Sequence, residues 1–373
     1  MAKATFFPKS FMKKLIVFAI VLCLCFVCIF IYSSTYALTN ISFKNEKIIS
    51  EKVPESFDGI KLVYFSDIYY GEFMNEKRFS KMVDEINRSD ADIVVFGGDL
   101  YSDKVDPNKS NQETLLALLT KIEAPLGKFC VLGDNDIMNE ERKQIISNLL
   151  FEANFEIITN QALTIHNKNK ASINLIGLEN YLNGNKDYSN ALKNMNTSQF
   201  NILVSHCPDI IKSKELNPTH LDLILTGHSL GGQIYVPFIN MFQEIKGAID
   251  YNRGTYYIEN CELIVSNGLG TSENDIRLFT PPQIHVFHFQ TVKEDIVVNE
   301  SKDHASKEEI SDQNDENENS ENNESTQIDE NMDDLNSDES ISNEEISEES
   351  NETNDSYSDT NDYENSDDVE NTQ

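Results

Sequence analysis

The sequence predicts an α/β domain in which a two-sheet sandwich is flanked by helices. Three observations support this prediction. In the first half of the chain, apolar β-branched runs alternate with stretches of helical spacing, which implies parallel strands. In the second half, short apolar runs are separated by Gly, Asn and Pro, as in hairpins. A long apolar stretch comes before both halves and an acidic segment comes after them, so we expect the domain to span residues 36–290.

Six apolar runs have the length and composition of buried strands: residues 61–65, 92–96, 128–132, 173–177, 201–205 and 221–226. Helices are expected between the early runs, around residues 79–86, 115–122 and 145–150, because apolar side chains recur there with helical spacing. Four shorter strands are expected in the second half: residues 233–236, 255–258, 261–265 and 284–289. Ligands of such a domain bind at the carboxyl ends of its parallel strands.

An unbroken apolar stretch covers residues 15–32. A spanning helix needs roughly 17–25 residues and a signal-peptide core about 7–15, so the length favours a membrane anchor. Four lysines come before the stretch, with no acidic residue among them: Lys3, Lys9, Lys13 and Lys14. We therefore expect a cytoplasmic segment at residues 1–14, a transmembrane anchor or uncleaved signal at residues 15–33, and a domain outside the cytoplasm, with the lipid bilayer as a partner. The alternative is a signal peptide removed near residues 35–37, which gives a secreted protein.

The C-terminal segment is strongly acidic. From Thr291 to the end the chain has 30 acidic and 3 basic residues, so −27 of the net charge of −33 lies there. Residues 294–373 are rich in Asn, Ser, Glu and Asp and cannot bury enough apolar surface to offset chain entropy, which predicts a disordered tail. The tail is interpreted as a solvated spacer, with loose cation binding or repulsion from an anionic surface as alternatives. Nucleic acid is not expected as a partner, because no basic patch is present to neutralise phosphates.

Polar clusters follow the predicted strands at regular places along the chain. Five motifs carry them: SDIYYG with Asp67, GGDLYSD with Asp99, LGDNDI with Asp134 and Asn135, VSHCPD with His206, and TGHSLGGQ with His228. Carboxylates and imidazoles at the ends of successive strands are the groups that a divalent metal site needs. The sequence therefore predicts a metal centre at one edge of the sheets.

The order and spacing of these motifs resemble the calcineurin-like metallophosphoesterases. That family reads D-x-H, then G-D, then G-N-H-[DE], then a lone H, then G-H-x-H. The closing Gly268-Leu269-Gly270 turn, Arg277 and the Pro-Pro pair at 281–282 resemble a membrane-associated bacterial branch of the family. The resemblance covers residues 61–289 and implies the metallophosphoesterase fold, two metal ions and hydrolysis of phosphoesters.

The resemblance also implies a ligand set, and it implies that this set is incomplete. Asp99, Asp134, His206 and His228 match the ligands of the second metal, where two imidazoles and two carboxylates suit Zn²⁺, Mn²⁺ or Fe²⁺. At the first metal, Asp67 and the bridging Asp99 remain, but Tyr69 and Leu230 stand where the family has histidines. Asp134 replaces a neutral amide by a carboxylate, which should tighten cation binding. We expect a degenerate first site and one tightly bound ion per chain.

Proton transfer is affected as well. Asn135 occupies the position of the histidine that the family uses as general acid, and loss of a positioned acid costs roughly 10²–10⁴ in rate. Asp136 matches the carboxylate that supports that histidine. Arg277 is a candidate contact for a substrate phosphate, with a structural ion pair as the alternative.

Two functions follow from this reading. One is a membrane-anchored, outward-facing, metal-dependent phosphoester hydrolase with an impaired site. The other is a catalytically inactive family member that serves as a binding or scaffolding module. Lipid-linked pyrophosphates, nucleotides and phosphoproteins remain open as substrates.

Overall fold

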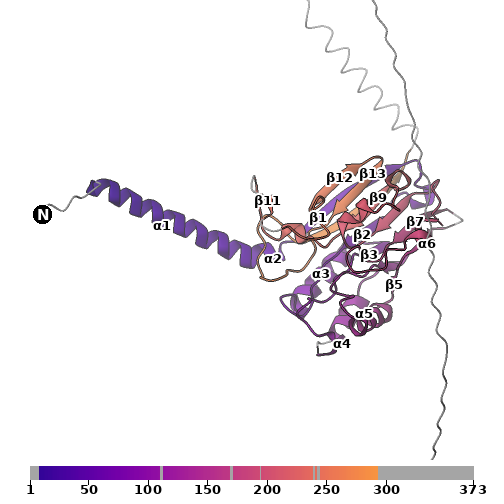
Figure 1. Ribbon diagram of the computed structural model, residues 1–373, viewed down its shortest axis with the longest axis horizontal. Helices are drawn as coiled ribbons and strands as arrows, with labels where there is room; N and C mark the ends of the chain where they lie inside the picture. The colour runs from indigo at the N-terminus through magenta and orange to yellow at the C-terminus, as the bar shows by residue number, and fades with distance from the viewer. Residues whose placement is uncertain are drawn as a thin grey trace, which may run out of the picture. The chain divides into compact units, whose positions relative to one another are not determined.

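The computed structural model of the protein describes residues 8–109, 112–168, 171–193, 195–237, 240–241 and 244–292. Two six-stranded mixed sheets pack against each other, and helices cover their outer faces (Figure 1). The predicted two-sheet sandwich is thus confirmed. The predicted tail at residues 294–373 lies outside the described residues.

The first sheet joins the N-terminal strands to the last strand of the domain. Its order is β1 (Ser42–Ser50), β14 (Gln283–Thr291), β2 (Lys61–Phe65), β3 (Ile93–Phe96), β4 (Lys128–Cys130) and β5 (Phe155–Ile157). Strands β2 to β5 run parallel, as the alternation of strands and helices predicts. Strand β14 runs antiparallel to β2 and parallel to β1, so the last strand closes the sheet beside the first.

The second sheet is built from the later strands. Its order is β12 (Gly254–Ile258), β13 (Cys261–Val265), β9 (Leu223–Thr226), β8 (Asn201–Val204), β7 (Ser172–Gly177) and β6 (Gln161–His166). Its four central strands are parallel, and the β12–β13 and β6–β7 hairpins form its edges. A separate antiparallel pair is formed by β10 (Tyr235–Val236) and β11 (Asn240–Met241).

Three helices cover the first sheet: α3 (Glu76–Arg88), α4 (Gln112–Thr120) and α5 (Glu140–Glu152). Figure 1 shows them gathered on one side of the sheets. Asn75 and Asn139 begin α3 and α5, because each side chain accepts a hydrogen bond from a main-chain N–H of the first turn. Apart from the N-terminal helical run, the other described helices are short: α6 (Ser189–Lys193) and the 3₁₀ turns η2 (Glu55–Phe57), η3 (Pro107–Lys109), η4 (Pro208–Lys212), η5 (Pro218–His220) and η6 (Leu230–Gly232).

Both faces of the central strands are buried, which explains their continuous apolar runs. In β2, Leu62 and Tyr64 point into the core between the sheets, whereas Val63 and Phe65 pack under α3, α4 and α5. The second sheet has its own outer cluster around Ile176, with α6 and η4 over it. The two sheets are therefore held in a fixed relation, which fixes the loops at their ends.

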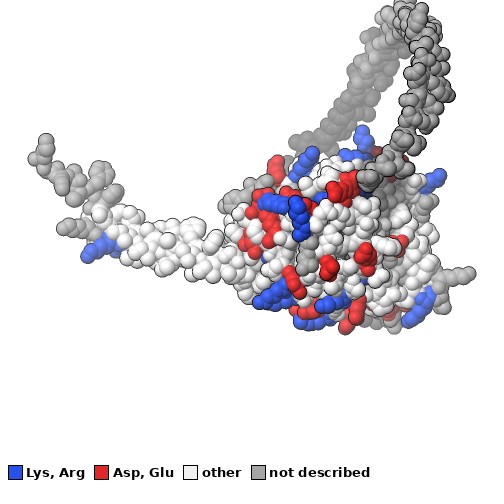
Figure 2. Space-filling view, turned by 90° about the horizontal axis from the view of Figure 1, so that it is seen from below, with Lys and Arg blue, Asp and Glu red and all other residues white. Residues whose placement is uncertain are grey.

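The N-terminal helical run leads directly into the domain. It comprises α1 (Lys9–Ile31), the π-helical turn η1 (Tyr32–Tyr36) and α2 (Ala37–Thr39). Ser10–Thr39 is long and apolar enough to cross a membrane, with a mean hydropathy of 3.2 in its most apolar window and none of that window buried. Figure 2 shows α1 without charged side chains along most of its length, with basic residues near its N-terminal end. At the other end Ser33, Ala37 and Leu38 are buried, and β1 begins two residues after α2.

The sequence prediction misses four strands, β1, β5, β6 and β11, and some of the predicted strands are shorter in the structure. Strand β1 carries Lys44, Glu46 and Lys47 and reads as polar, because it is an edge strand that buries few side chains. The expected strand at 233–236 begins only at Tyr235, because Gln233 turns the chain with a φ of 55°. Strands β5 and β6 were also not expected; each carries exposed polar residues beside its buried ones.

Candidate metal centre

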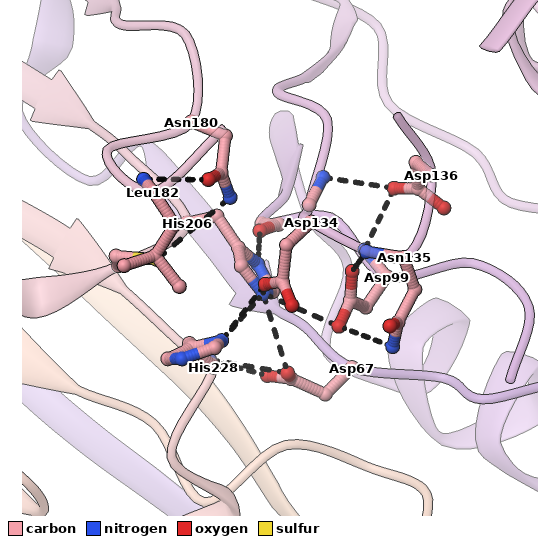
Figure 3. A network of polar contacts seen from close by, with 12 residues as sticks. Asp67, Asp99, Asp134, Asn135, Asp136, Asn180, Leu182, His206 and His228 are labelled. Carbon is pink, nitrogen blue, oxygen red and sulfur yellow. Dashed lines mark hydrogen bonds and ion pairs between the residues drawn. The ribbon is translucent and has the colours of Figure 1, made fainter. Parts of the chain in front are cut away.

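The predicted ligands lie on loops that leave the carboxyl ends of five parallel strands. Asp67 follows β2, Asp99 follows β3, Asp134 follows β4, His206 follows β8 and His228 follows β9. Because β2 to β4 belong to one sheet and β8 and β9 to the other, the two sheets bring these loops together at one rim of the sandwich. Figure 3 shows the side chains turned toward one another.

The loops have an unusual backbone that aims these side chains. Five motif residues take left-handed angles, with φ between 52° and 69°: Asp67, Tyr69, Asp99, His228 and Leu230. Neighbouring glycines make room for them, since a Cβ on Gly133 would lie 2.0 Å from Oδ1 of Asp99, and one on Gly227 would lie 2.4 Å from Oδ2 of Asp67. A left-handed residue other than glycine costs about 1–2 kcal/mol. Strain of this kind persists where the surrounding structure enforces it, which is common at functional sites.

Four of the five ligands form one compact group. One ligand atom from each of Asp99, Asp134, His206 and His228 lies within 4.8 Å of all the others. Nε2 of His206 is 3.3 Å from Oδ2 of Asp99 and 3.2 Å from Oδ1 of Asp134. Nδ1 of His228 is 2.9 Å from the same Asp134 oxygen and 3.3 Å from Nε2 of His206.

In each imidazole one ring nitrogen, the inner one, faces the cluster. The other, outer nitrogen forms a hydrogen bond with a main-chain carbonyl. Nδ1 of His206 lies 2.7 Å from the carbonyl oxygen of Gly97, and Nε2 of His228 lies 2.7 Å from that of Lys246. A carbonyl oxygen only accepts, so both outer nitrogens carry their protons. In the neutral ring the inner nitrogen then presents a lone pair to the cluster. Metal-binding histidines are oriented in this way.

This arrangement fits a cation. Two inner nitrogens and two carboxylate oxygens lie about 3 Å apart with lone pairs facing one another, and only a proton or a metal ion between them removes the repulsion. Burial opposes a charge on His206, but Asp99, Asp134 and Asp67 outweigh it and raise the pKa of this ring well above its ordinary value. Burial raises the pKa of Asp99 to about 7, with Asp134 and Asp136 adding to the effect. Without metal the cluster therefore holds protons that a divalent ion can displace.

The positions of the family's first metal look different. Asp67 is fully buried, but both its oxygens accept a hydrogen bond from the main-chain N–H of His228, at 3.1 Å each. Burial, followed by the charges of Asp99, Asp67 and Asp134, raises the pKa of Tyr69 well above its ordinary value, so the phenol keeps its proton. Leu230 is buried and offers no ligand atom. Asp67 thus lies beside the four-residue group without a histidine partner of its own.

Asn135 turns inward and contacts the carboxylate of Asp99. Its Nδ2 donates to Oδ2 of Asp99 at 2.8 Å, and its main-chain N–H donates to Oδ1 at 3.0 Å. Asp136 lies behind the cluster and accepts from the main-chain N–H groups of Asp99, Leu100 and Gly133, at 2.8–2.9 Å. Asp136 therefore ties two ligand loops together, a role that sequence reasoning did not assign to it.

Arg277 does not face the site. It is fully buried, and its guanidinium donates to the carbonyl oxygens of Asn267, Gly268, Gly270 and Thr280. The side chain is buried away from the site and serves as neither a phosphate contact nor an ion pair, because its described hydrogen bonds go to main-chain carbonyls of one closed loop. The loop in turn holds Asp67, since Gly270 donates its N–H to the carbonyl of that residue at 2.7 Å.

Sequence reasoning missed Arg142, which plays a similar part on the other side of the site. Its side chain is buried and donates to the carbonyl oxygens of Asn135, Val105, Tyr101 and Ser102. Arg142 lies in the first turn of α5, where its main-chain N–H donates to the side chain of the Asn139 cap. An arginine in the first helical turn carries no sequence signal for such a role, since most such residues are solvent-exposed.

Histidines and carboxylates that converge at the strand ends of a two-sheet α/β sandwich are typical of metal-dependent phosphoesterase domains. Comparison with known proteins agrees. Residues 60–232 match the family model of the calcineurin-like phosphoesterases. An uncharacterized metallophosphoesterase of Bacillus subtilis, YkuE, is 30% identical over 240 residues, which cover 64% of this chain and 82% of YkuE. The chain therefore belongs to the calcineurin-like phosphoesterase family.

Two other relatives extend the comparison. An uncharacterized metallophosphoesterase of Aquifex aeolicus is 29% identical over 248 residues, which cover 64% of this chain and 87% of that protein. A transmembrane protein with a metallophosphoesterase domain from Danio rerio is 26% identical over 194 residues, which cover 50% of this chain and 43% of that protein. The family and the cluster together indicate a metal-dependent, phosphoesterase-type role.

Proposed function

We propose that this protein is a membrane-anchored phosphoester hydrolase that works with one tightly held divalent ion. The observation that carries the proposal is the pair of imidazoles whose outer nitrogens bond to the carbonyls of Gly97 and Lys246 and whose inner nitrogens face Asp99 and Asp134. These four side chains would hold Mn²⁺, Zn²⁺ or Fe²⁺. When bound, such an ion neutralises charge on phosphoryl oxygens and lowers the pKa of a coordinated water.

The chain replaces the first metal of the family by hydrogen-bond donors. Oδ2 of Asp99, the bridging position in the family, accepts from the amide of Asn135 at 2.8 Å. The hydroxyl of Tyr69 stays protonated beside the same carboxylate. Asn135 thus offers a neutral donor to Asp99, and the protonated Tyr69 lies beside the same carboxylate, which bridges the two metals in the family. This is why we propose a degenerate first site with a single ion at the second.

The presence of Asn135 in place of the family's histidine also weakens proton supply to the leaving group. Asn135 has no titratable proton, and its amide is already committed to Asp99. Asp136 is fully buried behind the loops and is bonded to three main-chain N–H groups. Esters whose leaving group departs without a proton are therefore the favoured substrates, because the missing acid costs them little.

We propose that the anchor is the helical run Ser10–Thr39 and that the domain lies outside the cytoplasm. The apolar character of the helix and the transmembrane relative from Danio rerio support an anchor. The lysines before the helix support a cytoplasmic N-terminus. Secretion after cleavage is the alternative, but it would remove Ser33, whose carbonyl accepts the main-chain N–H of Arg277 at 3.0 Å.

A second candidate is a non-catalytic binding or scaffolding module. It is favoured by the three replaced positions, Tyr69, Asn135 and Leu230, of which one has lost its ligand atom altogether. Under this proposal the cluster holds an ion that stabilises the loops, and no ester is turned over.

The test uses the full-length protein in detergent with bis(p-nitrophenyl) phosphate and, in turn, Mn²⁺, Zn²⁺ and Fe²⁺. We expect one ion per chain and slow release of p-nitrophenol, both lost in His206→Ala. His166→Ala is the matched control, because this histidine is exposed on β6 away from the cluster. Turnover that survives His206→Ala would refute the proposed site. A bound ion without turnover on this aryl ester would favour the binding module.

A further inference from the structure

The membrane helix and the metal site are joined by a short chain of buried contacts. Ser33, in the last turns of the helical run, is buried, and its carbonyl accepts the N–H of Arg277 at 3.0 Å. The guanidinium of Arg277 donates to the carbonyls of Gly268 and Gly270. Those glycines hold Asp67, because Gly270 donates to its carbonyl and a Cβ on Gly268 would lie 2.6 Å from its Cβ. The end of the helix thus docks on the rim that carries the metal loops.

The connection between the helical run and the domain is short. Helix α2 ends at Thr39 and strand β1 begins at Ser42, where it pairs with β14 along its whole length. The helix is therefore fixed at both sides, through Ser33 to the Arg277 loop and through β1 to the first sheet. A domain attached in this way cannot move far from the membrane surface.

Two tyrosines in the π-helical turn η1 indicate where the membrane surface lies along the helix. Tyr32 and Tyr36 are 43% and 57% exposed, and their ring centroids lie 5.6 Å apart. Tyrosines at the end of an apolar span lie at the level of the lipid headgroups. Because Ser33 stands between them in the sequence, the docking contact lies at the headgroup level too.

A third aromatic residue belongs to this surface. Phe279 is 56% exposed and lies two residues beyond Arg277, in the loop whose Thr280 carbonyl accepts from the same guanidinium. Leu278 of this loop bonds through its main chain to Gln233, the last residue of the His228 motif, and to Tyr235. An exposed phenylalanine in the loop that contacts Ser33 is suited to insert between lipid headgroups.

From these contacts we infer that the rim of the metal site rests on the lipid headgroups and that the substrate is a phosphoester displayed at the membrane surface, an amphiphile with its phosphate at headgroup level. The inference rests on the proposed anchored hydrolase. In the reaction, water adds hydroxide to phosphorus and releases a proton, and the ester oxygen leaves with the bonding electron pair. The acyl-bearing part stays in the membrane.

The position of the rim can be tested without turnover. The sequence contains no tryptophan, so Phe279→Trp places a single fluorophore on the proposed contact surface. Phe151→Trp is the matched control: it is 76% exposed near the end of α5, beside the edge strand β5 and across the sheet from β1. In phosphatidylcholine vesicles with bromine on the upper acyl chain, we expect strong quenching at position 279 and little at 151. Equal quenching at the two positions would overturn the inference.

The substrate class is tested with two esters that share p-nitrophenol as leaving group, soluble bis(p-nitrophenyl) phosphate and vesicle-embedded phosphatidyl-p-nitrophenol. A 20-residue Gly/Ser spacer inserted after Ile31 adds a flexible link of about 25 Å. We expect the spacer to lower turnover of the lipid ester by about tenfold or more, to leave the soluble ester unchanged and to abolish quenching at position 279. The same spacer after Val292 is the control and should change neither ester.

The outcomes separate the two proposals. If the wild-type chain hydrolyses neither ester, the proposal that the protein is a hydrolase is refuted. Turnover of the soluble ester alone, or lipid turnover that the spacer after Ile31 does not lower, would overturn the membrane-substrate inference and leave the hydrolase standing.

Discussion

Replacing Arg277 by methionine should destabilise the domain by about 2–4 kcal/mol. The guanidinium donates to four carbonyls, and one of them, on Gly268, also accepts the N–H of Gln283 at 3.2 Å. The other three carbonyls lose this donor, and an unsatisfied buried acceptor costs about 1–3 kcal/mol. Part of that cost is offset, because a buried charge is removed as well: burial lowers the pKa of Arg277 to about 9.

The assay is thermal unfolding of the full-length protein in detergent, followed by circular dichroism. For a domain of this size each kcal/mol shifts the midpoint by about 2–4 °C, so a fall of roughly 5–15 °C is expected. Arg277→Lys should recover only part of it, because lysine keeps the charge and loses the planar fork. Arg88→Met is the control, since Arg88 is exposed and, among the residues that the structure describes, forms its ion pair with Glu85 on the same helix. A midpoint for Arg277→Met equal to that of Arg88→Met would refute the proposed role of the guanidinium.

Three further predictions concern the metal. Elemental analysis should find one tightly held ion per chain, lost in His206→Ala and largely kept in Asp67→Ala; two tight ions would contradict the degenerate first site. Metal affinity should rise with pH through about 7, because the raised pKa values of Asp99 and His206 mean that the metal-free chain binds protons that the ion must displace. Calorimetric titration in two buffers of different ionisation enthalpy should show proton release, and an affinity independent of pH would count against the cluster. Restoring histidine at all three replaced positions together should recruit a second ion and raise turnover most for alkyl esters, in a non-additive way; brisk alkyl hydrolysis by the wild type would show that another residue supplies the proton.

The sequence predicts the inner strands well but misses three of the four edge strands, β1, β5 and β6, for a physical reason. Strand β2 is buried on both faces and reads as a continuous apolar run, and its bounds agree with the expectation. Strand β1 is held mainly by main-chain pairing with β14, and such pairing leaves no pattern in the side chains. A parallel edge strand with charged residues is therefore visible only in three dimensions.

The same distinction holds at the site. The order of motifs after successive strands is enough to predict that Asp99, Asp134, His206 and His228 converge. The direction of each lone pair is not predictable, because it depends on contacts between distant residues, such as that of His206 with Gly97. The inward turn of Asn135 depends likewise on a tertiary contact, in this case with Asp99.

The left-handed loop residues have a consequence for the history of this protein. Tyr69 and Leu230 keep a costly backbone angle although the Tyr69 phenol holds its proton and Leu230 offers no ligand atom. Main-chain bonds, such as that of the Tyr69 N–H to the carbonyl of Asp99, hold the loop shape whatever the side chain. Ligands can therefore be lost or regained one substitution at a time without a refolding step between them. The shape of the loops and the identity of the side chains on them are therefore separable properties of this fold.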